Sequence, residues 1–547
     1  MYNYDAVVIG GGHNGLVAAC YLASRGLKVG VFEANEFLGG MASTPELWRG
    51  FKVPVGAYVL SLFHRGLAEE LGLFKAGLEL IPKDPGMTVL LDNGRVASTW
   101  SSLDKTVEEI RRFSEKDSKA YIEWSRFWGF ATTVLDYIYL NPPMDIAEAL
   151  DLALKAVKAS KITGMSSLIE DLQVVLTAPA SRLLDEFFES PEVKALLVED
   201  AVVGELVGPS SPGSALVLAH HYMGNITGVR GQWAYVKGGM GRLSELLAER
   251  CRSLGVDVHL GSRVEEIIVR NGSLAGVRVN GRVYRAKFAL SSVDARVTLL
   301  DLLKWDEAGL DKRLVRRLRS LKSIGVSSKV VAALRGLPKL RGAYSEYADR
   351  IFRSSALTIE SVDYVERAYR EALAFGASRE PWISINTQSY LDPTVAPEGW
   401  HIISLFTQYT RYDSPGGWDE ASREKLANTV FEVLDRYFEN FKGGVEKTLV
   451  LTPRDYEDLF KAPGGHIFHI SATLDQLWIN RPLPELSKYR TPIKGLYLCG
   501  SSTHPGGGVT GLPGYLAART LLEDIGVERP KRTPLRFLLR MLRGFFK

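Results

Sequence analysis

The chain has few cysteines for its 547 residues. Only Cys20, Cys251 and Cys499 occur, and no two of them form a CxxC pair. These spacings exclude a disulfide framework and predict no dithiol redox centre, and they argue against a zinc–thiolate site. The neighbouring His220 and His221 have no carboxylate or cysteine close to them in sequence, so we expect no metal site.

Long uncharged stretches are also scarce. Residues 6–24 carry no charged side chain and approach the length of a membrane span. However, the GGGHNG string at residues 10–15 would expose backbone polar groups to lipid, so we expect a strand, a loop and a helix of a soluble domain. Because a strand is expected within a few residues of Met1, we expect no signal peptide and a cytoplasmic protein.

The charges nearly balance, with 67 basic and 63 acidic residues and a net charge of +4. Residues 531–547 hold six basic residues and no acidic one, so the rest of the chain carries −2. This balance lacks the basic main domain expected of a nucleic-acid-binding protein, and we expect no nucleic-acid partner.

The basic tail itself has an amphipathic pattern. At helical spacing its basic residues fall in one sector, and most of its leucine and phenylalanine side chains lie opposite. The pattern predicts either an interfacial helix on the inner face of an anionic membrane or a helix docked on the protein body or on a second subunit of a homo-oligomer. The residues assigned to the membrane contact are Arg536, Arg540, Arg543 and Lys547.

A glycine motif follows the first predicted strand, residues 6–9. It precedes an apolar helix over about residues 16–25 and a second strand over residues 28–32, which ends at Glu33. Glycines at this spacing let the backbone approach a pyrophosphate, the helix N-terminus supplies N–H groups, and the acid accepts ribose hydroxyls. The layout predicts a dinucleotide site with contacts from Gly10, Gly12, His13, Asn14, Gly15 and Glu33.

Two further glycine-rich segments fit the same ligand. Residues 39–41 would pass close to the dinucleotide, and a strand at residues 495–499 leads into a glycine-rich loop and a helix over residues 509–522. One FAD explains all three segments, with the positive end of the last helix aimed at the flavin. The additional expected FAD contacts are Gly39, Gly40, Met41, Gly500, Thr503, His504, Gly507, Gly508, Val509 and Thr510.

The middle of the chain predicts a small sheet that belongs with the FAD site. A glycine cluster at residues 238–241 precedes a helix over residues 242–253, and alternating strands follow as far as residue 292. Val264 is expected to make a backbone contact on the adenine side. Because the glycine cluster at residues 238–241 is not a GxGxxG motif and the sequence shows no second dinucleotide-binding unit, we expect no domain for NAD(P)H, and we expect electrons to pass to oxygen or a quinone.

Several strings together resemble the phytoene desaturase-related FAD-dependent oxidoreductases. They are GGGHNGLVAA (10–19), GGMASTPELWRGFKVPVGAYVLSL (39–62), FSEKDSKAY (113–121), GGHIFHISATLDQL (464–477) and LYLCGSSTHPGGGVTGLPG (496–514). The resemblance implies an α/β, glutathione-reductase-like fold: a discontinuous FAD-binding Rossmann domain with an inserted α+β substrate domain. Residues 1–84, 234–292 and 490–526 would form the former, and residues 85–233 and 293–489 the latter.

The resemblance also implies a chemistry. Members of the family desaturate, saturate or isomerise long apolar polyisoprenoids, so we expect an isoprenoid- or carotenoid-like substrate. One departure concerns a pyrophosphate contact, because Met41 stands where the wider family often has arginine. An amine-oxidase-like enzyme acting on a small substrate and a non-catalytic flavoprotein scaffold remain as alternatives.

Two features of the predicted substrate domain allow two interpretations each. Alternation in GHIFH at residues 465–469 would place His466 and Phe468 on one face and Ile467 and His469 on the other. His469 is the acid/base candidate, and the alternative is a structural histidine. A run of aromatic residues is either core or the wall of a substrate tunnel: Tyr121, Trp124, Phe127, Trp128, Phe130, Tyr137 and Tyr139.

Overall fold

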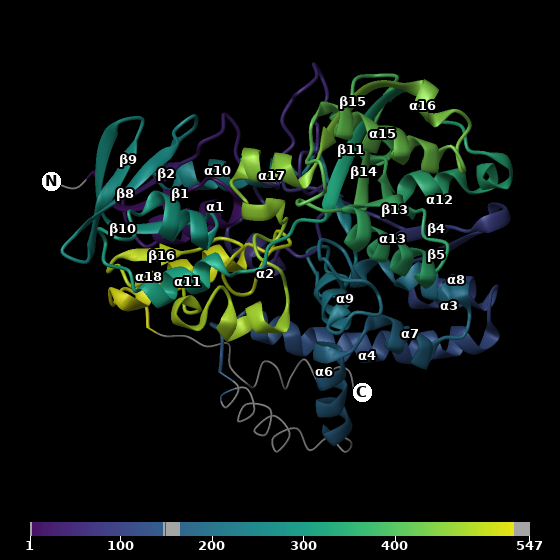
Figure 1. Ribbon diagram of the computed structural model, residues 1–547, viewed down its shortest axis with the longest axis horizontal. Helices are drawn as coiled ribbons and strands as arrows, with labels where there is room; N and C mark the ends of the chain where they lie inside the picture. Colours follow the sequence, from purple (N-terminus) through teal and green to yellow (C-terminus); the bar gives the residue numbers. More distant parts are fainter. Residues whose placement is uncertain (1–2, 146–147, 149–164, 530–547) are drawn as a thin grey trace.

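The computed structural model describes residues 3–145, 148 and 165–529, in two lobes that are each built on a mixed β-sheet (Figure 1). Residues 531–547, with Arg536, Arg540, Arg543 and Lys547, lie outside this range, so the basic helix stays a prediction. Within the described ranges, no helix is long and apolar enough to cross a bilayer. No group of three or more His, Cys, Asp or Glu side chains in this part could hold a metal ion.

The first sheet joins segments from both ends and the middle of the chain. Its order is β7-β2-β1-β10-β16, and these strands pair in parallel. Strands β8 and β9 continue β10 as an antiparallel meander. The bounds are β1 (Tyr4–Ile9), β2 (Val29–Phe32), β7 (Asp257–His259), β8 (Val264–Arg270), β9 (Ser273–Val279), β10 (Arg282–Ser291) and β16 (Leu496–Leu498).

The pleat of β1 divides the core of this lobe. Ala6 and Val8 belong to the apolar cluster that includes helices α1 (His13–Ala23), α10 (Gly241–Ser253) and α18 (Leu512–Asp524). The alternate residues of β1 belong to a second cluster, with apolar side chains of the meander and of α11 (Lys312–Arg319). Both faces of β1 are therefore buried, as expected for a parallel strand with an apolar run.

Two segments assigned to the substrate domain pack against the first sheet instead. Apolar side chains of residues 295–321 and 470–486 belong to the cluster that also holds residues of β1 and β10. Leu314 and Leu318 of α11 supply part of this face, while the arginines between them point outward. The predicted boundary at residue 293 was therefore wrong, because the chain covers the first sheet before it enters the second lobe.

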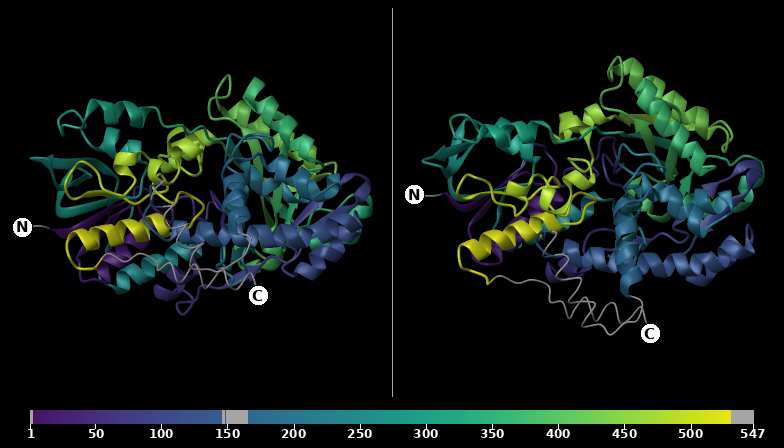
Figure 2. Two further views of the ribbon diagram at one scale, coloured as in Figure 1. Left: turned by 90° about the horizontal axis from the view of Figure 1, so that it is seen from below. Right: turned by 60° about the horizontal axis from the view of Figure 1, so that its bottom comes forward.

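The second sheet has the order β15-β11-β14-β13-β12-β4-β5 and is antiparallel except at the β12–β4 pair. Its bounds are β4 (Met87–Leu90), β5 (Val96–Thr99), β11 (Ser327–Arg335), β12 (Ser355–Leu357), β13 (Ala377–Asn386), β14 (Trp400–Thr410) and β15 (Val445–Leu451). Helix α15 (Glu420–Leu434) packs on one face, and the long helix α4 (Glu115–Tyr139) lies on the opposite side of the lobe (Figures 1 and 2). A two-stranded sheet of β3 (Leu80–Pro82) and β6 (Ala234–Val236) lies apart from both larger sheets in the pairing order.

The remaining helices are mostly short. They are α2 (Arg65–Glu70), α3 (Leu103–Arg111), α6 (Met165–Thr177), α7 (Ala180–Phe187), α8 (Pro191–Leu197), α9 (Ser214–Tyr222), α12 (Ala348–Arg353), α13 (Val362–Phe375), α14 (Gln388–Leu391), α16 (Phe441–Gly444) and α17 (Pro453–Phe460). Helix α1 begins three residues earlier than the sequence predicts, directly after Gly12.

The aromatic run of α4 is part of the core. The Trp124 ring packs edge-on against Trp128, Phe187 and Phe188, each with ring centroids 5.3 Å apart. None of the seven aromatic residues of this run lines the large cavity described below, although Tyr139 borders a smaller one. The tunnel interpretation of this run was therefore wrong, since edge-to-face packing uses these rings to join α4 to its neighbours.

Two of the three cysteines meet. Cys20 of α1 and Cys251 of α10 are fully buried, with their Sγ atoms 2.7 Å apart. Sequence spacing suggests no such thiol pair, because 231 residues separate the two positions. Burial raises the pKa of the Cys20 thiol well above its usual value, which favours the protonated, unreactive form.

The packing of α10 on α1 gives a stability prediction. Leu247 of α10 is 0% exposed, so Leu247→Ala leaves a cavity and should lower the free energy of unfolding by about 2–5 kcal/mol. Leu373→Ala, at a side chain 45% exposed on α13, should change it by less than about 0.5 kcal/mol. Urea denaturation followed by circular dichroism measures both, and equal midpoints for the two variants would contradict the packing.

Candidate cofactor and substrate site

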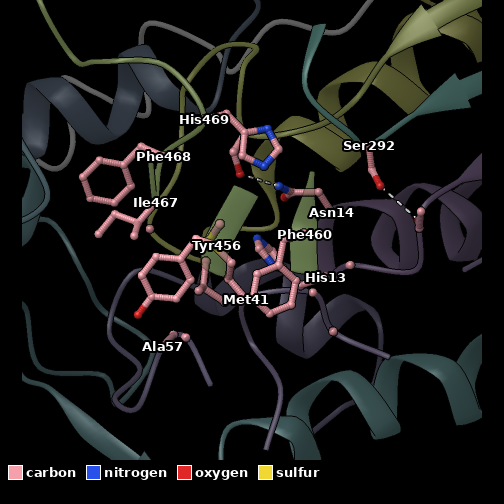
Figure 3. A pocket seen from close by; sticks show the side chains of 18 of the residues that line it. His13, Asn14, Met41, Ala57, Ser292, Tyr456, Phe460, Ile467, Phe468 and His469 are labelled. Atoms are coloured by element: carbon pink, nitrogen blue, oxygen red, sulfur yellow. Dashed lines mark hydrogen bonds between the residues drawn. The ribbon is translucent and has the colours of Figure 1, made fainter. Parts of the chain in front are cut away.

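One elongated cavity of about 290 Å³ extends between the two lobes. At one end it is lined by the glycine loop before α1, and at the other by residues of the second sheet and of the segment after α8. Figure 3 shows side chains from both ends of the chain around it, with His13 and Asn14 close to His469. The cavity thus collects segments that are hundreds of residues apart.

The three glycines of the first motif differ in what surrounds them. Gly10 has φ +91°, and a Cβ there would lie 2.6 Å from Ser292 Oγ. A Cβ on Gly15 would lie 2.2 Å from the Gly10 carbonyl oxygen, so this glycine allows α1 to pack against the loop. A Cβ on Gly12 would find only the Gly39 carbonyl oxygen, at 3.9 Å, and Gly12 faces the cavity. Gly10 and Gly12 line the cavity, whereas Gly15 supports it from behind.

Glu33 closes the far end of this loop. Its Oε2 accepts a hydrogen bond from the Gly11 N–H at 2.7 Å, and its Oε1 accepts one from the Asn35 N–H at 2.9 Å. Burial raises the pKa of the Glu33 carboxyl, and the backbone N–H groups around it oppose that rise. Glu33 and Val264 both line the cavity, so they lie together as the sequence predicts for the adenosine side.

The second glycine pair runs beside the first motif. The Gly39 N–H donates to the Gly11 carbonyl at 2.9 Å, and both Gly39 and Gly40 have positive φ. Gly39, Gly40 and Met41 all line the cavity. Met41 therefore lines the cavity with a thioether side chain at the position where the wider family often has arginine.

The C-terminal glycine-rich loop is only partly at the cavity. Gly508 and Val509 line it, as does Ser501, whose Oγ accepts a hydrogen bond from Asn14 Nδ2 at 3.3 Å (Figure 3). The other predicted contacts in this loop lie behind the cavity wall: Gly500, Thr503, His504, Gly507 and Thr510.

These five residues have local roles in shaping the loop. A Cβ on Gly500 would lie 2.3 Å from the Ser292 carbonyl oxygen, and one on Gly507 would lie 2.5 Å from Phe468 Cδ1. The Thr503 hydroxyl donates to the Gly500 carbonyl, and the Thr510 carbonyl accepts from the His64 N–H. His504 is fully buried, with Nε2 3.2 Å from the Ile138 carbonyl oxygen. A direct ligand contact from His504 is therefore not supported by its position.

The expected alternation at residues 465–469 was wrong. The chain turns there, with the His469 N–H donating to the His466 carbonyl at 2.9 Å and His469 at φ +69°. As a result Ile467, Phe468 and His469 all line the cavity. His466 is instead buried behind it, with Nε2 3.4 Å from Glu205 Oε2.

A fully buried arginine holds this turn against the glycine-rich loop. Arg481 Nη2 donates to the carbonyls of Ser501 at 2.8 Å and of Phe468 at 2.9 Å. Its Nε also donates to the Ser501 carbonyl, and its Nη1 donates to the carbonyls of Ser471 and Gln476. Burial lowers the pKa of Arg481 to about 10, which keeps it charged at neutral pH. Sequence reasoning missed Arg481 because no motif marks it.

Several cavity residues have polar atoms with no partner among the residues described. Both ring nitrogens of His13, Oδ1 of Asn14 and Nδ1 of His469 are buried without a hydrogen bond. Burial lowers the pKa values of His13 and His469 to about 4, so both rings are neutral at pH 7. Orphaned polar atoms beside the open Gly12 and a free helix N-terminus fit a phosphate-bearing ligand.

The second-lobe end of the cavity has a different character. Most of its wall is apolar or aromatic, with Met87, Val203, Trp233 and Phe406 contributing. Glu199, Asp200, His221 and Ser355 are polar residues in this wall, and none of them belongs to a sequence motif. Sequence reasoning missed this polar group because its members come from separate stretches of chain.

The family comparison agrees with this geometry. Residues 15–520 match the model of the family described as flavin containing amine oxidoreductase. The chain belongs to this family. It is an α/β FAD-dependent oxidoreductase of the amine oxidase and phytoene desaturase superfamily, with a Rossmann domain and a substrate domain.

Individual relatives cover nearly the whole chain. "Pyridine nucleotide-disulfide oxidoreductase domain-containing protein 2" of Rattus norvegicus is 37% identical over 95% of this chain and 94% of its own. A limonene dehydrogenase subunit of Castellaniella defragrans is 27% identical over 96% and 95%, and a neurosporene-forming phytoene desaturase of Cereibacter sphaeroides is 25% identical over the same shares. A crystal structure of an oxidoreductase from Methanosarcina mazei has a TM-score of 0.57 at 16% identity, covering 95% of this chain and 99% of its own.

The residues present fit FAD. Gly10, Gly12 and the N-terminus of α1 would hold the pyrophosphate, Glu33 the ribose, and the segment of Ser501, Gly508 and Val509 the flavin side. When bound, FAD supplies an acceptor for two electrons and a proton from substrate. The chain's own part is to position the two ligands against each other.

The two kinds of glycine give a mutational test. Gly12→Val should fold, because Gly12 has φ −67° and open space in front of it, but the added side chain should fill the cradle. We expect purified protein with native circular dichroism and no visible flavin absorbance. Gly15→Val should instead give insoluble or unfolded protein, because of the clash with the Gly10 carbonyl. Full flavin content in Gly12→Val would refute the cradle.

The buried histidines predict an acid sensitivity. The pKa values of His13 and His469 in the folded protein are about 4, against an ordinary value of 6.5. Between these values the unfolded chain binds more protons, so the free energy of unfolding should fall as pH drops from 6.5 to 4. For each histidine replaced by asparagine, the slope of the unfolding free energy against pH should decrease by about 1.4 kcal/mol per pH unit. Urea denaturation at pH 7.5, 6 and 5 tests this, and an unchanged slope in the double variant would contradict it.

Proposed function

We propose that this protein desaturates, saturates or isomerises a long apolar, isoprenoid- or carotenoid-like molecule at its flavin, and that electrons pass to oxygen or a quinone. The supporting observation is the second-lobe end of the cavity. Its wall of Met87, Val203, Trp233, Phe406 and Phe468 offers an apolar surface that adjoins the cofactor loops. Such a wall binds hydrocarbon by excluding water and orients it through shape.

Two relatives support this substrate class. The names of the limonene dehydrogenase subunit and of the phytoene desaturase both refer to isoprenoid hydrocarbons. Removing hydrogen from such a molecule requires little from the protein except orientation against the flavin and a place for the accompanying proton.

Amine oxidation is the second candidate, because one observation favours it. Glu199 and Asp200 line the same end of the cavity and are each 5% exposed. A carboxylate in that place could attract a cationic amine, so the substrate test includes amines as a direct comparison.

The test is anaerobic reduction of the protein-bound flavin, measured as the loss of its visible absorbance. Limonene, phytoene in detergent micelles, cyclohexylamine, NADH and NADPH are added separately to the oxidised holoprotein. We expect bleaching by a hydrocarbon and persistence of the flavin band with the nicotinamides and the amine. Bleaching by the amine alone would favour the second candidate, and prompt bleaching by NADH or NADPH would contradict the expected oxygen or quinone partner.

A cavity variant provides the matched control. Val203→Trp narrows the second-lobe end without touching the glycine loops, so flavin content should stay normal while the rate of bleaching by the hydrocarbon falls at least about tenfold. Leu373→Ala on α13 should leave both unchanged. Equal bleaching rates in all three proteins would contradict binding in this cavity.

A further inference from the structure

A buried polar group lies at the apolar end of the cavity. It consists of Glu199 and Asp200, in the short helical turn after α8, and of Lys83, which follows β3. Glu199 and Asp200 are each 5% exposed and line the cavity, and Lys83 is 1% exposed behind it. Two carboxyl groups therefore border the cavity in a mostly apolar wall, with one buried ammonium group behind that wall.

Lys83 is anchored by neutral partners. Its Nζ donates to Ser355 Oγ and, at 3.0 Å, to Asn386 Oδ1, and it lies 5.3 Å from the centre of the Tyr235 ring. Asn386 Nδ2 in turn donates to Ser384 Oγ at 3.1 Å. The Ser384 side chain also acts on the Glu199 carboxyl and lowers its pKa, against the larger opposite effect of burial. Hydrogen-bonded side chains thus lead from the amine of Lys83 as far as Ser384, next to one of the two acids.

Asp200 has no such support. Asp200 is 5% exposed and borders the cavity. Its carboxyl accepts no hydrogen bond from the part of the chain that the structure describes. Neither Asp200 nor Glu199 forms an ion pair within 4 Å in that part. A buried carboxylate without partners is strongly disfavoured, so a proton or a ligand must complete it.

The electrostatics agree with retention of a proton. Burial raises the pKa of Glu199 to about 7, and it raises the pKa of Asp200 well above its ordinary value, with repulsion from Glu199 adding to the rise. Burial lowers the pKa of Lys83 to about 7. The two acids titrate as one unit, since a charge on either changes the other.

The other titratable groups around the pair do not neutralise it. Tyr58, Tyr222 and His221 face it from the loop before α2 and from α9. Burial raises the pKa of each tyrosine and lowers that of His221, so all three are neutral near pH 7. Lys83 is a cation that acts on both acids, and one cation whose own pKa is lowered to about 7 cannot balance two carboxylates.

We propose that Glu199 and Asp200 form the proton-accepting group of the reaction, a role that rests on the proposed oxidation of a hydrocarbon. In the forward direction one substrate C–H bond breaks, and its hydrogen leaves with the electron pair as hydride to the flavin. The neighbouring C–H bond gives its proton to a carboxylate oxygen of the pair, and its electrons form the new C=C bond. The substrate loses two hydrogens in total, the flavin gains two electrons and one proton, and the pair gains one proton.

This assignment differs from the expectation for His469. His469 lies beside His13 and Asn14 at the cofactor loop (Figure 3), with a pKa of about 4 that makes it a weak base at neutral pH. A base is most effective when its pKa lies near the working pH, as it does for Glu199. The acid pair also lies in the wall where the apolar substrate is proposed to bind.

The first experiment needs no substrate. Infrared spectra of the holoprotein between pH 5 and pH 9 are compared for the wild type, Glu199→Gln, Asp200→Asn and Glu109→Gln. We expect the carbonyl band of a protonated carboxyl to disappear with a midpoint near pH 7 and to be lost or shifted in the first two variants only. Glu109 is a matched control because it is 6% exposed but is paired with Arg112 and Arg350 outside the cavity. A band that is absent, or unchanged in both pair variants, overturns the proposal.

The second experiment uses the hydrocarbon that bleaches the wild-type flavin. Glu199→Gln should slow bleaching by roughly 100- to 10,000-fold with little change in the half-saturating concentration, and Glu199→Asp should recover part of the rate. The wild-type rate should rise with pH through about 7, because the ionised form accepts the proton, and the variant should show no such rise. Full activity with the same pH profile in Glu199→Gln and Asp200→Asn would overturn the assignment.

The two readouts separate this proposal from the proposed function. If no hydrocarbon bleaches the wild-type flavin, the substrate class is wrong, and with it the proton-accepting role in that reaction. The infrared titration would in that case still report whether the pair holds a proton. If a hydrocarbon bleaches the flavin and the pair variants are normal, the substrate class stands and only the pair's role is wrong.

Discussion

The cavity depends on a buried cation, Arg481, which forms no ion pair with a carboxylate in the part of the chain that the structure describes. Arg481 donates to carbonyl oxygens of the turn around Phe468 and of the segment at Ser501, and so fixes two stretches that have no regular structure of their own. A guanidinium group suits this task because its donors diverge in a plane and it keeps its charge when buried. The placement of His469, Gly508 and Val509 around the flavin side follows from that junction, since an irregular loop lacks the repeated hydrogen bonds of a helix or strand.

The part of the fold that binds the dinucleotide was predictable from sequence because its signals are local. The strand, the glycine spacing and Glu33 lie within about thirty residues, and each has a steric or electrostatic reason that acts over a few bonds. The glycine spacing alone cannot tell which glycine touches the ligand. Gly12 faces the cavity and Gly15 faces a carbonyl group, and only their surroundings in the fold distinguish them.

The polar residues at the second-lobe end of the cavity could not be predicted from sequence, because no local signal connects them. Lys83, Glu199 and Ser355 are separated by more than a hundred residues each, and alone each resembles an ordinary surface residue. The alternation predicted for residues 465–469 was wrong because it assumes an extended strand, whereas the chain turns at residues 466–469. The boundary at residue 293 failed similarly, since amphipathic α11 could have covered either sheet.

The two walls of the cavity belong to different sheets, which makes them separable in evolution. Substitutions on the second-sheet side can alter which molecule fits without replacing a residue of the cofactor loops, although the largest hydrophobic cluster extends across both lobes and joins the two walls. The substrate can therefore change through substitutions in one wall while the residues of the cofactor loops stay the same. The spread of names among the relatives, from a limonene dehydrogenase subunit to a phytoene desaturase, is the pattern that such a division of labour would leave.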